Sequence, residues 1–303
     1  MERRSPFTAF VVFGGLLGLC FFFTLALFKA LEASPAESYG WSRGRGPRVG
    51  VVEIKGVIAD SKEFLSQLVE LRRDPTIKAI VVRIDSPGGA VAPSQEMFRA
   101  VQRARRDKKV VASMGTLAAS GGYYVAAAAD RIIASPGTIT GSIGVISQFP
   151  DLSGLLELAR LRETTIKSGP LKDTGTPTRP MTPEERTYFQ GLVDALYDQF
   201  LSDVAQARQL PKEAVRKVAD GRVLTGQQAM AAKLVDELGN FEDALEAAAK
   251  LAGGTGDPVP VFIKKRKGLL ADLVEGGAES AAGVLKEQLV PGAAIELRDP
   301  WLR

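Results

Sequence analysis

After residue 48 the chain alternates between short apolar stretches and stretches of helical character, and this alternation strongly constrains the fold. Valine, isoleucine and other apolar residues crowd segments of strand length at residues 48–58, 78–84, 109–114 and 131–134. Helical spacing or small helix-forming residues occupy the intervals at residues 61–73, 94–106 and 120–129. Strands that alternate with helices predict an α/β fold, in which crossover helices join the strands of a parallel sheet.

The second half of the chain is mainly helical in its pattern. Residues 182–185 read TPEE, a helix start signal, and predict a long amphipathic helix over residues 183–208. Further elements are expected at the following positions: helices at 211–219, 226–236 and 241–251, and a strand at 259–263. Residues 264–303 are rich in Gly and Ala, so a loosely structured tail is expected after a globular domain over residues 48–263.

The N-terminal segment predicts a membrane anchor. Residues 7–28 contain no charged side chain, and 22 helical residues span about 33 Å, enough for a hydrocarbon core. Arg3 and Arg4 favour a cytoplasmic N-terminus over residues 1–6, with the remainder of the chain across the membrane. A cleaved signal peptide is the alternative, since residues 33–36 are small, but its apolar region would be shorter. Residues 29–47 then form a tether to the domain.

The absence of histidine and the presence of a single cysteine restrict the kinds of catalytic and metal site that the chain can form. The chain has no histidine, which excludes Ser-His-Asp and Cys-His catalysis and zinc sites built on imidazole. Its one cysteine, Cys20, lies inside the apolar run, so intrachain disulfides are impossible and a thiol nucleophile in the domain is excluded. A net charge of +4 without a basic, aromatic-rich stripe argues against nucleic acid as a partner. No cofactor is expected.

Residues 85–89 (DSPGG) follow a buried strand. A proline and two glycines allow the backbone to turn sharply and to expose N–H groups, such as that of Gly89, to a developing negative charge. An ordinary strand-to-helix turn is the alternative reading of the same residues.

Ser120 is the candidate nucleophile. It follows a strand and a turn of small residues at 115–119, and it begins a helix, where free N–H groups and the helix dipole suit an oxyanion. A serine that merely caps the helix would have the same sequence context.

Residues 167–173 (KSGPLKD) supply a candidate base. A lysine acts as a general base only when it is neutral at the working pH, and Gly and Pro before Lys172 suggest a shaped loop. A solvated surface charge is the alternative reading of Lys172.

Taken together, these motifs resemble the signal peptide peptidase A family of bacteria in its short, single-repeat form. The ordered motifs are SPGG at 86–89, AASGGYY at 118–124, TGSIGV at 140–145, IKSG at 166–169, KD at 172–173 and MTPEE at 181–185. The resemblance runs from about residue 48 to 250. It implies a Clp protease/crotonase-like fold with repeated β-β-α units, here preceded by the one transmembrane helix.

The resemblance also implies a role for each matching residue. Ser120 corresponds to the nucleophile and Lys172, rather than Lys167, to its general base. Ser142 corresponds to the hydroxyl that orients the lysine. The backbone N–H groups of Gly89 and Gly121 correspond to the oxyanion hole.

The function implied is that of a membrane-anchored serine endopeptidase. It would degrade remnant signal peptides and other membrane-associated peptides after secretion, on the extracytoplasmic side of the bacterial inner membrane. The resemblance implies a homo-oligomer, octameric in short forms, in which Ser120 of one subunit is completed by Lys172 of its neighbour. A crotonase-like acyl-CoA enzyme and an inactive membrane scaffold are the alternatives.

Overall fold

The computed structural model describes residues 46–263. The expected anchor at 7–28, the cytoplasmic N-terminus, nearly all of the tether and the tail at 264–303 lie outside the described residues. No helix within residues 46–263 is both long enough and apolar enough to cross a membrane.

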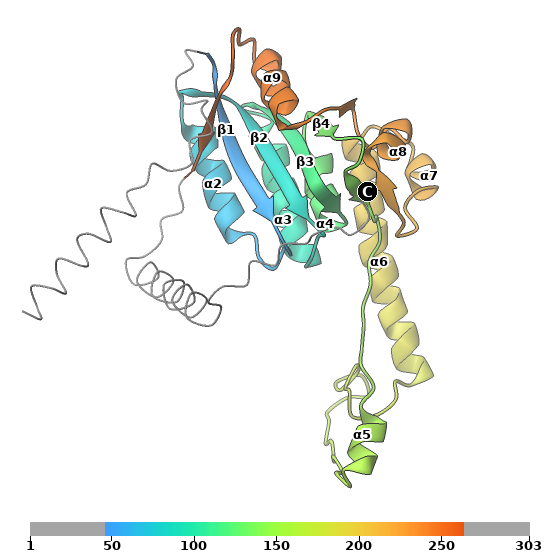
Figure 1. Cartoon of the computed structure of the whole chain (residues 1–303). Coiled ribbons are helices and arrows are strands. Elements are labelled where there is room, and N and C mark those ends of the chain that lie inside the picture. Colours follow the sequence, from blue (N-terminus) through green and yellow to red (C-terminus); the bar gives the residue numbers. More distant parts are fainter. Residues whose placement is uncertain (1–45, 264–303) are drawn as a thin grey trace, which may run out of the picture. The chain divides into compact units, whose positions relative to one another are not determined.

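One eight-stranded sheet forms the centre of the described chain (Figure 1). Its strands are β1 (Arg48–Lys55), β2 (Ile77–Ser86), β3 (Lys109–Ala119), β4 (Arg131–Ala134), β5 (Ile139–Gly141), β6 (Val223–Thr225), β7 (Glu237–Leu238) and β8 (Val259–Phe262). The main order is β6-β5-β3-β2-β1-β8, with β4 beside β3 and β7 beside β4. All pairs are parallel except β5 with β6, so the predicted α/β fold with a parallel sheet is confirmed.

The described chain is consistent with the expected Clp protease-like fold, although its element order shows repeated β-β-α units only in part. Single strands alternate with single helices through most of the described residues, and β4–β5–α5 is the one succession of two strands and a helix. Parallel neighbours need a crossover connection, and here α2, α3 and α4 provide it between successive strands.

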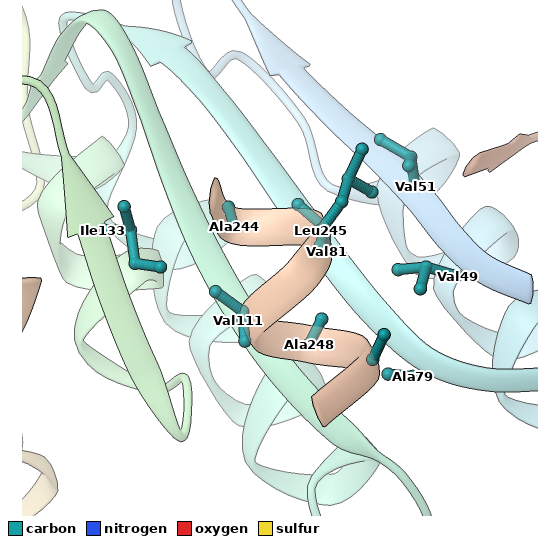
Figure 2. Packing of buried hydrophobic residues seen from close by; sticks show 10 residues of the cluster. Val49, Val51, Ala79, Val81, Val111, Ile133, Ala244, Leu245 and Ala248 are labelled. Carbon is teal, nitrogen blue, oxygen red and sulfur yellow. The ribbon is translucent and has the colours of Figure 1, made fainter. Parts of the chain in front are cut away.

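Helices cover both faces of the sheet. The first layer is α2 (Lys62–Arg73), α3 (Val91–Ala104) and α4 (Gly121–Ala127). Gly50 of β1 faces this layer, since a Cβ there would lie 2.6 Å from Leu71 of α2. Its neighbours Val49 and Val51 point to the opposite face, where α9 (Phe241–Leu251) inserts Leu245 among the sheet's valines (Figure 2). Residues of both faces are buried, as the continuous apolar runs predict.

The third strand is longer than its sequence predicts. The small residues at 115–119 were expected to form a turn, but β3 continues to Ala119. Val111–Met114 pair with β4, whereas Leu117–Ala119 pair with β5, so the strand changes partner along its length. Small side chains tolerate this change of partner, and the new ladder keeps the backbone extended up to Ser120.

The later helices follow the predicted order with shorter bounds. α6 (Pro183–Ala207) starts with the expected capping box, in which Thr182 and Glu185 each accept from the other's backbone N–H. α7 (Lys212–Arg216) and α8 (Gly226–Ala231) are shorter than expected. α8 ends early because Lys233 adopts a positive φ of 61°, which does not continue a helix. α9 has the expected bounds, and β8 differs from its prediction by one residue.

Residues 145–182, called the arm below, leave the sheet after β5 and return to the start of α6 (Figure 1). The arm contains α5 (Ser153–Leu158), which has no buried residue. It packs on the N-terminal half of α6, where the Phe149 and Phe189 ring centroids are 4.3 Å apart. The buried apolar residues of α6 lie in its C-terminal half, so this half packs against the rest of the domain.

Candidate active site

Ser120 lies where β3 ends and α4 begins. Its backbone has φ 50° and ψ −120°, an unusual conformation for a residue with a side chain. Its N–H donates to the Gly141 carbonyl at 2.9 Å, and its carbonyl accepts from Tyr124 N at 2.8 Å. The Ser120 hydroxyl makes no capping hydrogen bond, which removes the reading as an ordinary N-cap. A sharp strand-to-helix turn of this kind presents a serine side chain outward.

Gly88 packs directly against this turn. A Cβ at Gly88 would lie 2.5 Å from Gly121 N and 2.8 Å from Ser120 Cβ, and Gly88 has a φ of 95°. Only glycine allows both the conformation and the approach. The sequence predicts a donor at Gly89 but not the requirement for glycine at Gly88, although the paired glycines after a proline were the signal.

The backbones of Gly89 and Gly121 lie close together beside the turn that holds Ser120. A Cβ at Gly121 would lie 3.3 Å from Gly89 N. Neither N–H donates to another backbone group within residues 46–263. Gly89 also lies in the connection from β2 to α3 and forms a β-bridge with Ile58. The two interpretations of residues 85–89, an ordinary turn and a source of oxyanion donors, are therefore compatible. Two such N–H groups beside a serine can stabilise an oxyanion.

Ser142 lies at the matching position of the neighbouring strand. Ala119 pairs with Gly141 in the parallel ladder of β3 and β5, so Ser120 and Ser142 are the next residues of both strands. Ser142 has a φ of 50°, the same as Ser120, and its N–H donates to the Arg222 carbonyl at 2.8 Å. The structure therefore brings together four of the five expected site residues.

Two buried tyrosines fix the helix that follows the nucleophile. Tyr123 donates to the Leu234 carbonyl at 3.0 Å, and burial raises the pKa of its phenol, which remains a donor. Tyr124 donates to Asp203 of α6 at 2.5 Å and stacks on Phe200, with centroids 4.3 Å apart. Burial, followed by the hydrogen bond to Asp203, raises the pKa of Tyr124. α4 is thus held to the C-terminal half of α6.

Lys172 lies on the arm, apart from the other four residues. No hydrogen bond or ion pair links its side chain to another residue of the described chain. The adjacent Asp173 contacts Arg179, and Arg179 contacts Glu185 at the start of α6. Phe200, which stacks on Tyr124 beside the nucleophile, lies 15 positions further along this helix, roughly 22 Å at 1.5 Å per residue. Within one chain the structure does not bring Lys172 to Ser120.

The ion pairs around Asp173 were not anticipated from the sequence. Lys167 and Arg179 both contact Asp173, and Arg179 also makes two hydrogen bonds to Glu185. The start signal of α6 at residues 182–185 indicated that the Glu185 carboxylate would cap the helix, but it did not indicate that Arg179 would be its ion-pair partner. Within the described part of the chain, no group of three or more acidic, His or Cys side chains could hold a metal ion.

Comparison with known proteins identifies the family of this site. The model of the family described as "Peptidase family S49" matches residues 102–254 of this chain. These residues include Ser120, Ser142 and Lys172. The model of the family described as "Clp protease" matches residues 51–138, which contain the alternating strands and helices up to β4. The first match alone covers half of the chain.

Several curated proteins are similar over most of the chain. "Putative protease slr0021" of Synechocystis is 42% identical over 77% of this chain and 84% of that protein. "Putative signal peptide peptidase SppA" of Enterococcus faecium is 37% identical over 66% of this chain and 62% of its own length. "Protease 4" of Salmonella typhi is 39% identical over 75% of this chain, which spans 41% of that longer protein. The chain therefore belongs to peptidase family S49.

Proposed function

We propose that the chain is a serine endopeptidase with Ser120 as nucleophile and Lys172 as general base. The observation that carries the proposal is the unusual backbone of Ser120, whose hydroxyl makes no capping hydrogen bond and whose turn packs against Gly88, between Gly89 and Gly121. A non-glycine residue held at positive φ costs free energy, so it is more typical of a functional site than of an ordinary turn.

Peptide cleavage requires two proton transfers: from the Ser120 hydroxyl to Lys172, and then from Lys172 to the leaving amine. The Ser120 oxygen attacks the peptide carbonyl carbon while its proton passes to the neutral amine of Lys172. The N–H groups of Gly89 and Gly121 donate to the oxygen that becomes negative. Lys172 then protonates the leaving amine, and an ester on Ser120 remains. Water then attacks this ester and gives a proton to Lys172, which passes it to the Ser120 oxygen as the carboxylic acid product leaves.

Lys172 suits the role of base better than Lys167 does. The Lys167 ammonium forms an ion pair with Asp173 and donates to the Pro170 carbonyl at 3.0 Å. An amine that is already engaged by a carboxylate and a carbonyl is not available to accept the Ser120 proton. Lys172 has no such partner among the described residues, and Ser142 would orient its amine next to Ser120.

The separation of Ser120 from Lys172 supports a site completed by two copies of the chain, in a homo-oligomer that the sequence resemblance makes octameric. The arm that carries Lys172 exposes apolar side chains that a neighbouring copy would cover. They include Ile146, Leu155, Leu158, Leu161 and Ile166, with Ile166 exposed at 96%.

The substrates we propose are remnant signal peptides and other membrane-associated peptides. Residues 7–28 are long and uncharged, so they would anchor the enzyme in the bacterial inner membrane as a single-pass protein. The arginines before them favour a cytoplasmic N-terminus, so we expect the catalytic domain on the extracytoplasmic side. A relative named as a signal peptide peptidase is consistent with apolar peptides as substrates.

The test is labelling and hydrolysis by the full chain in detergent. A fluorophosphonate probe should label the parent and not Ser120→Ala, and an apolar fluorogenic peptide should be cleaved by the parent and not by Ser120→Ala. Lys172→Ala should lose most of the activity, while a matched substitution at an unpaired lysine of another surface, Lys78→Ala, should retain it. Full hydrolysis by Lys172→Ala would show that the base is another group.

A further inference from the structure

Four charged side chains on and next to the loop that carries Lys172 are linked in series by ion pairs. Asp173 Oδ1 accepts from Lys167 Nζ at 2.5 Å, and Asp173 Oδ2 accepts from Arg179 Nη2 at 3.0 Å. Arg179 also donates to both oxygens of Glu185, at 2.5 and 2.9 Å. Two cations and two anions thus balance one another, and we call these four residues the ion cluster.

The ion cluster is attached to the start of α6. Glu185 is buried, with only 3% of its surface exposed, and its Oε2 accepts from Thr182 N at 3.0 Å in the capping box. The hydrogen bond from Arg179, followed by that from Thr182, lowers the pKa of Glu185 to about 2. The arm is therefore tied to a helix end through a carboxylate that remains ionised at any working pH.

Asp173 is the neighbour of Lys172 in the chain, yet its two oxygens form ion pairs with other cations, Lys167 and Arg179. Hydrogen bonds from Lys167 and then from Arg179 lower the pKa of Asp173 to about 2. Its side chain is 13% exposed. An ionised carboxylate that contacted the Lys172 ammonium would stabilise the charged form of that lysine by Coulomb attraction. Such a contact would oppose the role of a base.

The remaining charged groups near the loop do not contact Asp173. Those that line the pocket shared by Lys167, Asp173 and Arg179 are Glu157, Arg162 and Glu163. Those that line the adjoining pocket with Arg179 are Asp151 and Arg186. Within the described chain, the ion pairs of Asp173 are with Lys167 and Arg179.

We propose that Arg179 is a positioning residue of the protease, which holds Asp173 away from Lys172 so that Lys172 can lose its proton. The inference rests on the proposed function of Lys172. Arg179 acts through Asp173, while Glu185 fixes the guanidinium that does so. Lys167 occupies the other carboxylate oxygen of Asp173, whereas only Arg179 links Asp173 to Glu185 and so to the start of α6.

The test compares rate against pH for four full-length proteins: the parent, Arg179→Met, Arg179→Met with Asp173→Asn, and Arg162→Met. Arg162 lies on the same arm and forms no ion pair with another described residue, so it is the matched control. In Arg179→Met the freed carboxylate oxygen stabilises the Lys172 ammonium. The midpoint of the pH–rate profile should then rise by about one unit or more, which lowers the rate roughly tenfold at pH values below the midpoint.

The double variant separates electrostatics from structural damage. Removing the charge of Asp173 should bring the midpoint back to within a few tenths of the parental value, even where the maximal rate stays low. An unshifted midpoint in Arg179→Met, or a shifted midpoint that the double variant retains, would overturn the proposal. Failure of the proposed function is a different result: it would be activity in Lys172→Ala, measured in the same assay.

Discussion

The carboxyl ends of β2, β3 and β5 hold Ser120 among buried backbone, whereas Lys172 lies on an arm attached by partly buried ion pairs. In the first region the sheet ladder and the glycine contacts determine every position, as the 2.5 Å approach of a Cβ at Gly88 to Gly121 N illustrates. In the second region α5 has no buried residue, and the arm is attached through Arg179, Asp173 and Glu185.

This contrast indicates a division between a rigid half and an adjustable half of the proposed site. Backbone packing resists small changes, because a close-packed interior has no space for added atoms. Ion pairs near the surface depend on pH and on salt, so the position of Lys172 should be sensitive to conditions that leave Ser120 in place. The two halves can therefore be disturbed separately.

The largest effect is expected from Gly88→Ala. The added methyl group would overlap Gly121 N and Ser120 Cβ, in a residue with φ of 95°, so the donors and the nucleophile must shift. Peptide hydrolysis should fall by about 100-fold or more, the size expected when an oxyanion donor is displaced. Gly154→Ala in α5 is the control, since a Cβ there meets nothing within 4 Å. Equal rates for both variants would contradict the rigid-half interpretation.

An intermediate effect is expected from mixed subunits. Ser120→Ala and Lys172→Ala should each be inactive alone, and co-assembly at equal amounts should restore about a quarter of the parental rate. The fraction follows because half of the copies keep the serine and half of their neighbours keep the lysine. Mixtures that remain inactive, although co-purification proves mixed assembly, would mean that each chain completes its own site.

The smallest effect is expected on acidification, and it should be confined to the arm. The pKa values of Asp173 and Glu185 are about 2 in the folded chain, below ordinary values of 3.8 and 4.5. Their stabilisation of the arm is therefore complete above about pH 4.5 and is lost as the pH falls toward 2. Pepsin should cut within residues 145–182 increasingly below pH 4, while Arg179→Met should already be cut at pH 4. Cleavage within β1–β3 before the arm would contradict this order.

The elements themselves follow from local sequence. Alternating strands and helices were predicted within a few residues, and α9 and the capping box of α6 had the expected bounds, because apolar spacing and caps act over only a few positions. The absence of histidine, together with the serine and lysine motifs, directed attention to Ser120 and Lys172 without any structure.

Long-range pairing decided what local sequence could not. β3 extends to Ala119 because β5, some 20 residues away, supplies hydrogen bonds that a small-residue segment cannot form alone. The positive φ of Ser120 results from the contacts of Gly88 and Gly141 on either side. The separation of Lys172 from Ser120 depends on the full length of α6, and the partners of Asp173 depend on how the arm folds back. Both features depend on how segments that are distant in the sequence approach one another in space. Only the tertiary structure therefore determines them.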